Sequence, residues 1–129
     1  MRIRVGRIVV IAILAEFLAV LTLVLIVALF GPADPAAAQV YLESLGVWVG
    51  PIAGFAFTLV GGWWVAKSLA DSHLLNGFVL GLAVAIVDVS ILLFSEVGFL
   101  LIFAVSNIGR VIAGSIGGWI ASRSSSHAA

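Results

Sequence analysis

The chain has 129 residues, of which 64% are hydrophobic and only 9% are charged, and its mean hydropathy is +1.33. An ordinary soluble domain is about 45–50% apolar and about 25% charged, so this composition excludes a soluble globular protein and a disordered chain. The net charge is zero and cysteine is absent, which argues against nucleic-acid binding and excludes disulfides and thiolate metal sites. We expect one polytopic membrane domain over residues 1–129.

Four segments are long and apolar enough to cross a bilayer, which takes about 20 residues. They are expected at residues 8–30, 46–65, 74–94 and 99–121. The fold is therefore predicted to be all-α, a bundle of four transmembrane helices without a soluble domain. The first apolar run is longer than the core of a signal peptide, about 7–15 residues, so we expect this segment to be retained.

The connection between the first two spans is the longest one predicted, at residues 31–45. Pro32 and Pro35 favour an irregular start. Residues 39–44 fit two interpretations equally well, a short interfacial helix or a plain connector. Inside the second span, Pro51 lacks a backbone N–H group and is expected to kink the helix.

The charges outside the spans predict the orientation. Five basic residues lie on one side of the predicted topology: Arg2, Arg4, Arg7, Lys67 and Arg123. The loops on the other side carry Asp34, Glu43 and Glu96 and no basic residue. Because basic residues accumulate in cytoplasmic loops, we expect both termini in the cytoplasm, with the chain in a cell membrane, such as the inner membrane of a bacterium.

Tryptophans mark the predicted ends of the spans. They are Trp48 at the outer end of the second span, and Trp63, Trp64 and Trp119 at inner ends. Tryptophan is enriched where a membrane meets water, so we expect these four side chains to be interfacial anchors.

One short motif occurs twice. Gly-Gly-Trp at residues 61–63 recurs at residues 117–119, and Lys67 and Arg123 follow at the same distance. The repeat is compatible with a duplication that would make the chain two parallel helical hairpins. The alternative is chance similarity between helices that are built from few residue types.

Small residues recur at four-residue spacing along the predicted spans. The glycines in these stripes are Gly46, Gly50, Gly54, Gly77, Gly81, Gly114 and Gly118. Such stripes let membrane helices approach closely, so we predict a tightly packed bundle. Glycines in these positions could also line a narrow path between the helices.

Three ionisable residues lie within the predicted spans, namely Glu16, Asp88 and Arg110, and Ser106 and Asn107 accompany them. Charged residues in a membrane normally face the bundle interior and pair with each other. The helical rise of about 1.5 Å per residue places all three near the middle of the bilayer. We therefore predict one intramembrane polar network.

This network has three interpretations. It can be a structural ion-pair network that fixes the helix register, a proton relay or ion-coupling site, or a charge offered to a helix of a partner subunit. The sequence contains no cluster of metal ligands, and we expect neither a metal nor another cofactor.

Two resemblances follow from these residues. Ala-Ile-Leu-Ala-Glu at residues 12–16 resembles the first helix of small multidrug-resistance transporters, which implies a proton-coupling role for Glu16. The long first loop and Arg110 depart from that family. Residues 61–123 resemble small four-helix bacterial membrane proteins of uncharacterised function, which implies the architecture alone.

The absence of a catalytic constellation predicts a protein that is not an enzyme. We expect an accessory or assembly subunit that packs against the lipid bilayer and other membrane helices, from copies of itself or a partner subunit. The alternative is a small oligomeric proton- or ion-coupled transporter or channel that uses Glu16, Asp88 and Arg110.

Overall fold

The computed structural model describes residues 2–95, 98 and 100–126. Phe99, where the fourth span was expected to begin, and Glu96, used above for the orientation, lie outside the described residues.

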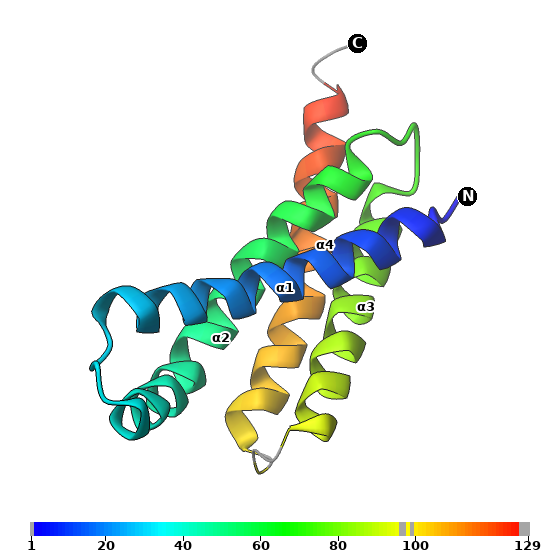
Figure 1. Cartoon of the computed structure of the whole chain (residues 1–129). Helices are drawn as coiled ribbons and strands as arrows, with labels where there is room; N and C mark the ends of the chain where they lie inside the picture. Colours follow the sequence, from blue (N-terminus) through cyan, green and yellow to red (C-terminus); the bar gives the residue numbers. More distant parts are fainter. Residues whose placement is uncertain (1, 96–97, 99, 127–129) are drawn as a thin grey trace.

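The described chain is all-α and consists of four packed helices (Figure 1). Their bounds are α1 Val5–Phe30, α2 Pro35–Ala66, α3 His73–Phe94 and α4 Leu101–Ser126. Each helix is long and apolar enough to cross a membrane. The predicted fold class and the existence of four spans are therefore confirmed.

The start of α2 differs from the prediction. The connection after α1 covers only residues 31–34, and α2 runs without interruption through residues 39–44 and Pro51. The Asp34 side chain accepts a hydrogen bond from the amide of Ala37 at 2.9 Å, and a proline occupies the first helical position. A capping side chain followed by proline is a strong helix start. The long connection expected at residues 31–45 was therefore wrong, and of the two interpretations of residues 39–44 the structure shows a helix, which is continuous with α2.

The added turns make α2 much longer than a membrane is thick. Its 32 residues span about 48 Å, against a hydrocarbon core of about 30 Å. Figure 1 shows the helix changing direction in its first half, and Pro51 lies near the midpoint of its range. Because proline leaves one carbonyl of the preceding turn unbonded, it favours bending there while the helix continues.

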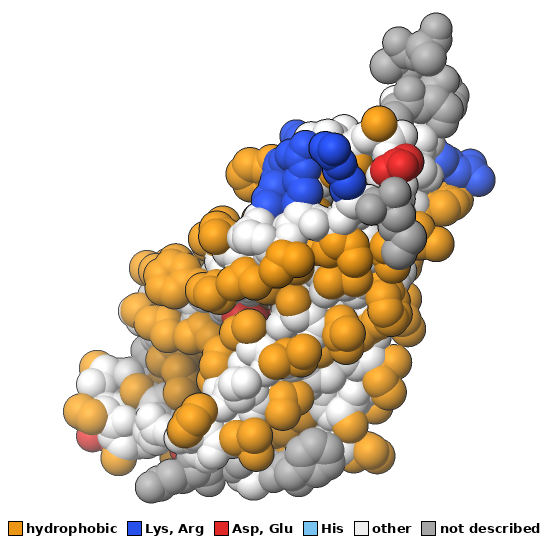
Figure 2. All heavy atoms as spheres, turned by 90° about the vertical axis from the view of Figure 1, so that its right-hand side faces the viewer, with side chains coloured by type: hydrophobic (Ala, Val, Ile, Leu, Met, Phe, Trp, Pro, Cys, Tyr) orange, Lys and Arg blue, Asp and Glu red, His pale blue; other side chains and the backbone are white. Residues whose placement is uncertain are grey.

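Both termini and the α2–α3 connection lie at one end of the molecule (Figure 1). The buried Asn76, in the first turn of α3, fixes the N-terminal segment there. Its amide nitrogen donates to the Arg2 carbonyl at 3.0 Å, and its amide oxygen accepts from the Arg4 amide at 3.3 Å. Arg7 donates to Ser68 Oγ at 2.6 Å and to the Trp64 carbonyl at 3.2 Å. Lys and Arg side chains gather at this end in Figure 2.

Glycine-to-backbone contacts join α2, α3 and α4. A Cβ atom added to Gly62 would lie 2.6 Å from the Gly114 carbonyl oxygen, and one added to Gly118 would lie 2.5 Å from the His73 carbonyl oxygen. Gly77 and Gly81 meet the backbone of α4 in the same way. A side chain at these positions would push two helix backbones apart, so glycine is needed for the close approach.

Gly46 and Gly50 do not take part in this packing. Among the described residues, no atom of a neighbouring helix lies within 4 Å of a Cβ built on Gly50, and one built on Gly46 meets the end of the Leu23 side chain. In α2 the close contact with another helix backbone is made by Gly62, while Gly61 meets the side chains of Ile11 and Leu80. The helix-packing role expected for Gly46 and Gly50 stays a prediction.

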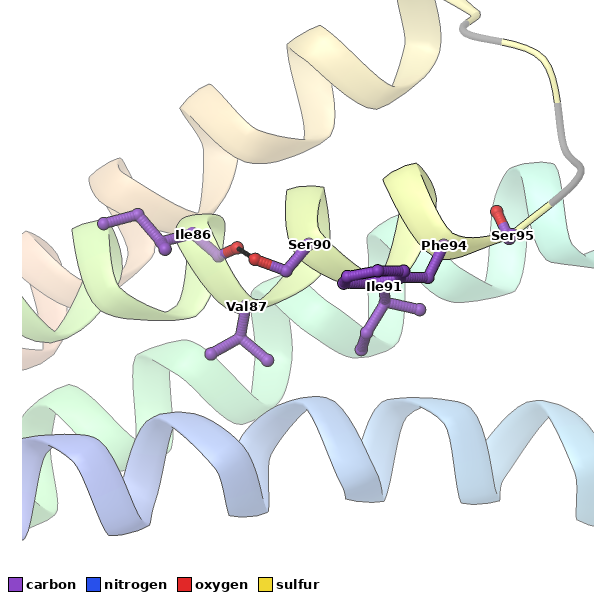
Figure 3. Close-up of a pocket in the computed structure, with 6 residues that line it drawn as sticks. All are labelled: Ile86, Val87, Ser90, Ile91, Phe94 and Ser95. Carbon is purple, nitrogen blue, oxygen red and sulfur yellow. Dashed lines mark hydrogen bonds between the residues drawn. The ribbon is translucent and has the colours of Figure 1, made fainter.

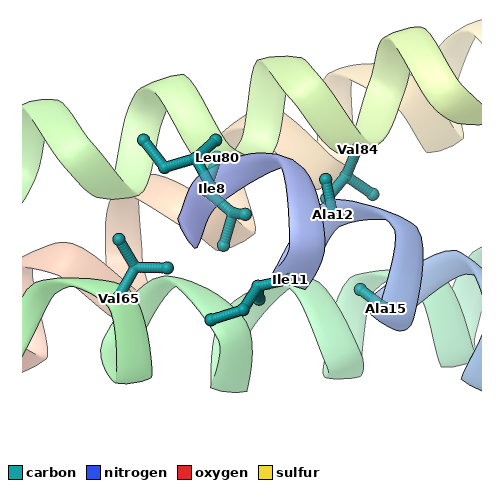
Figure 4. Packing of buried hydrophobic residues seen from close by; sticks show 7 residues of the cluster. All are labelled: Ile8, Ile11, Ala12, Ala15, Val65, Leu80 and Val84. Carbon is teal, nitrogen blue, oxygen red and sulfur yellow. The ribbon is translucent and has the colours of Figure 1, made fainter. Parts of the chain in front are cut away.

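The buried apolar core lies toward the end that carries the termini. Its members come from α1, α2 and α3 and are Ile8, Ile11, Ala12, Ala15, Val65, Leu80 and Val84 (Figure 4). Burial stops at a similar level on every helix: after Ala19 in α1, before Ala53 in α2, after Ala85 in α3 and before Ser106 in α4.

This boundary divides the bundle into two parts. The packed half comprises residues 5–19, 53–66, 73–85 and 106–126. The open half comprises residues 20–30, 35–52, 86–94 and 101–105, and none of its residues is buried. Figure 1 shows the α1–α2 and α3–α4 hairpins diverging toward their tips. The described molecule is therefore shaped like a fork.

The two hairpins are not packed equivalently. Among the described residues, α2 lies against α3, but the backbones of α1 and α4 are not neighbours. Two exact parallel repeats would make these two pairs alike. The duplication suggested by the repeated motif stays a prediction.

Candidate functional site: a buried ion network between the helices

Arg110 of α4 contacts the two other ionisable residues that the sequence placed in the spans, Glu16 and Asp88. Its Nε atom lies 2.6 Å from Glu16 Oε1 on α1, and its Nη2 atom lies 3.1 Å from Asp88 Oδ1 on α3. Its Nη1 atom donates to the hydroxyl of Ser106 one turn earlier. Arg110 and Glu16 are each 3% exposed and Asp88 is 15% exposed. Three helices thus meet through one guanidinium group.

The Arg110 side chain crosses the space between two helices to reach Glu16. The backbones of α1 and α4 are not neighbours among the described residues, so the ion pair depends on the length of the arginine side chain. Gly54 of α2 leaves room for the crossing: a Cβ atom there would lie 2.6 Å from Nη2 and 2.7 Å from Cζ of Arg110. Gly54 therefore accommodates the guanidinium group, whereas the sequence indicated helix packing or the lining of a narrow path.

Asn107 extends the network beside Asp88. Its Nδ2 atom donates to Asp88 Oδ2 at 2.8 Å and to the Phe103 carbonyl at 2.9 Å. Its Oδ1 atom is buried and has no hydrogen-bond partner among the described residues. A buried acceptor without a partner costs about 1–3 kcal/mol. Asn107 therefore combines a donor that is fully used with an acceptor that can still take a hydrogen bond.

The network lies where the packed half ends and the open half begins. Glu16 lies between the buried Ala15 and Ala19, and Asp88 lies one turn beyond Ala85, the last buried residue of α3. The ionic groups are thus closed off on one side and approached by the open half on the other.

The formal charges of the network do not cancel. Two carboxylates and one guanidinium give −2 + 1 = −1, and Ser106 and Asn107 are neutral. An uncompensated charge between apolar helices is costly. A proton, a cation or a basic side chain from outside the described structure would compensate it. The described residues contain no group of three or more metal-ligand side chains.

A hollow of about 550 Å³ lies along α3 in the open half (Figure 3). Its lining residues are Ile86, Val87, Ser90, Ile91, Phe94 and Ser95. Val87 and Ile91 point to the side on which α1 is drawn in Figure 3. The two serine hydroxyls donate to carbonyls of their own helix, Ser90 to Ile86 at 2.7 Å and Ser95 to Leu92 at 2.8 Å. The hollow therefore presents an apolar surface.

The four tryptophans lie toward opposite ends of the helices. Trp48 is 65% exposed in the first half of α2. Trp63 and Trp64 lie in the last turn of α2, and Trp119 lies near the end of α4. The Lys67 ammonium lies 4.3 Å from the centre of the Trp63 ring, and the Arg123 guanidinium lies 4.2 Å from that of Trp119.

Comparison of the chain with protein-family models, with curated proteins and with solved structures finds no match. No family is identified, and the resemblances noted in the sequence stay predictions. The site is therefore interpreted from its own chemistry.

Proposed function

We propose that this protein is a non-enzymatic membrane subunit whose open half receives a helix of another membrane protein. The observation that carries the proposal is the shared level at which burial ends on all four helices. Beyond that level, in the open half, the two hairpins leave apolar faces that the described residues do not cover. A bilayer houses the four spans, with both termini in the cytoplasm, as the basic end predicts.

The open half offers what helix association in a membrane requires. Lipid tails are as apolar as leucine, so helices associate through close packing and hydrogen bonds. Gly50 meets no neighbouring helix of the described residues and permits close approach, whereas Gly46 already lies against the Leu23 side chain of α1. At the base of the open half, the Asn107 Oδ1 atom can accept a hydrogen bond. A partner helix would gain contacts of both kinds.

Site-directed cross-linking tests this proposal, because the chain has no cysteine of its own. Gly50→Cys places a thiol in the open half at a position with space for it. Ile108→Cys, on the exposed outer side of α4, is the matched control. After mild extraction and a short cross-linker, we expect one stoichiometric partner from Gly50→Cys and none from Ile108→Cys. Equal yields from both positions, or cross-links to lipid alone, would contradict the proposal.

A second candidate is a small proton- or ion-coupled transporter. The observation that favours it is the formal charge of −1 at the base of a fork that is open on one side. Coupled transport needs at least one group that binds a proton or cation and that can be reached alternately from the two sides of the membrane. The structure supplies the binding charge and one open side.

Flux measurements separate the two candidates. In liposomes that contain the purified chain alone, coupling predicts a proton or cation flux that Glu16→Gln or Asp88→Asn abolishes. Asp34→Asn, at the exposed start of α2, is the control and keeps the flux. No flux from the wild-type chain would contradict the transporter and leave the subunit proposal, whereas an equal flux in all variants would show that Glu16 and Asp88 do not couple the flux.

A further inference from the structure

The repeated sequence motif forms the same local structure twice. In each copy a tryptophan is followed four residues later by a basic residue, Lys67 after Trp63 and Arg123 after Trp119. Residues four apart lie on one face of a helix. The cation lies over the indole ring in both copies, at 4.3 and 4.2 Å from the ring centre. We call these two arrangements the cation–indole pairs.

The glycines of the two copies place the pairs at the same level. A Cβ atom on Gly117 would lie 2.6 Å from the Trp63 amide nitrogen and 3.0 Å from the Gly62 carbonyl carbon. The end of α2 therefore packs directly on the corresponding turn of α4. The two cation–indole pairs flank this contact at the end of the molecule that carries the termini.

This end is strongly basic. Besides Lys67 and Arg123 it carries Arg2, Arg4 and Arg7, whereas Asp71 is its one acidic residue in the described chain. Arg7 is held against α2 by its hydrogen bonds to Ser68 and to the Trp64 carbonyl. Figure 2 shows the resulting cluster of basic side chains. The formal charge here is 5 − 1 = +4, without counting the chain ends.

We propose that the cation–indole pairs bind the phosphate groups of anionic phospholipids in the leaflet at this end of the protein. Indole rings prefer the headgroup level of a bilayer, and basic side chains near the surface attract anionic lipids. Trp119 is 47% exposed, and a hollow of about 450 Å³ beside it is lined by Trp119, Ile120, Arg123 and Ser124. The aromatic face fixes each cation at headgroup depth, where its N–H groups donate to phosphate oxygens.

The opposite end makes the proposed binding specific to one leaflet. In the described residues it carries Asp34 and Glu43 and no Lys or Arg. Trp48 lies in this part of the chain, and no cation–indole pair involves it among the described residues. Trp48 is therefore a built-in control, an indole exposed to lipid without a basic partner.

Quenching by brominated lipids tests the proposal. The purified full chain is placed in phosphatidylcholine vesicles with a minor fraction of brominated phosphatidylglycerol. One variant keeps Trp63 and Trp119 (Trp48→Phe with Trp64→Phe), and the other keeps Trp48 alone. In the variant that keeps Trp63 and Trp119, we expect quenching that corresponds to a local fraction of anionic lipid about fivefold or more above the bulk fraction. In the variant that keeps Trp48 alone, quenching should correspond to the bulk fraction.

The basic residues are then removed in the first background. Lys67→Gln with Arg123→Gln should lower the quenching to the value expected for the bulk fraction of anionic lipid. Lys67→Arg with Arg123→Lys should preserve the enrichment. Quenching by brominated phosphatidylcholine and the circular dichroism spectrum show that each variant is inserted and folded. Three outcomes would overturn the proposal: no enrichment in the wild-type background, enrichment that survives the glutamine variants, or displacement by inorganic phosphate beyond the effect of chloride at equal ionic strength.

Discussion

The packed half and the open half contain the same kind of small-residue spacing, yet only one of them brings helices together. In the packed half, a Cβ atom on Gly77 would lie 2.9 Å from the Gly118 Cα atom. In the open half, no atom of a neighbouring helix in the described chain lies within 4 Å of a Cβ atom on Gly50. The difference lies in what faces the glycine. Glycines on α3 face glycines on α4, whereas Gly46 faces a leucine side chain of α1. Small-residue spacing on one helix permits a close approach, and a second small surface is needed to make it.

The largest change in stability is expected for the ion network, which lies at the boundary between the packed half and the open half. Arg110→Ala leaves Glu16 and Asp88 without their cation, so we expect a loss of about 3–5 kcal/mol in the free energy of unfolding. Unfolding in mixed micelles of rising dodecyl sulfate content, followed by tryptophan fluorescence, measures this loss.

A matched variant removes all three charges at once, Glu16→Gln with Asp88→Asn and Arg110→Met. Replacing every charged partner is often close to neutral, so this variant should be more stable than Arg110→Ala. If Arg110→Ala unfolds at the wild-type detergent fraction, the network does not hold the hairpins together.

The glycine comparison predicts the next largest effect. Gly77→Ala adds a methyl group against the backbone of α4 and should cost about 1–3 kcal/mol, as overpacking does. Gly50→Ala meets no atom of another described helix. Because Pro51 crowds the side chain of the residue before it, the gain from the helix propensity of alanine should be partly offset, and stability should change by less than about 1 kcal/mol. The same unfolding measurement compares the two. An equal loss in both variants would mean that the open half is closed in detergent.

Gly54 lies at the boundary between the two halves, and its substitution should be energetically coupled to substitution of Arg110. In Gly54→Ala the new methyl group overlaps the guanidinium group, which should cost about 1–2 kcal/mol. In a double-mutant cycle with Arg110→Met this cost should largely disappear, with a coupling energy of about 0.5–2 kcal/mol. Additive effects would show that Gly54 acts through another neighbour.

The smallest effect is expected at the start of α2. Asp34→Ala removes the side-chain cap on the Ala37 amide, which is worth about 1 kcal/mol to the helix. Because the open half adds no buried contacts, the loss should stay local. We expect amide hydrogen exchange about fivefold faster at residues 36–38, with an unchanged midpoint of unfolding. A lower midpoint would show that the first turns of α2 are coupled to the packed half.

Much of the site was predictable because charges in apolar helices have few stable arrangements. Glu16, Asp88, Asn107 and Arg110 come together in the structure. Two features were not predicted from the sequence: the role of Gly54 and the start of α2. Gly54 shares its spacing with Gly46 and Gly50, and only the path of the Arg110 side chain distinguishes it. A connection was predicted before residue 46 because of Pro32 and Pro35, although alanine favours helix and Asp34 with Pro35 is a recognisable helix start.

Four long apolar helices, a group of basic residues at one end and an ionic group among the spans can all be predicted from the amino-acid sequence. Composition and helical rise decide these points, because both act within one helix at a time. Three features required the packed structure: the level at which the two hairpins diverge, the glycines that contact another helix backbone, and the helix that the Arg110 side chain crosses. These depend on the angle between helices, and that angle follows from the side chains on two facing surfaces at once.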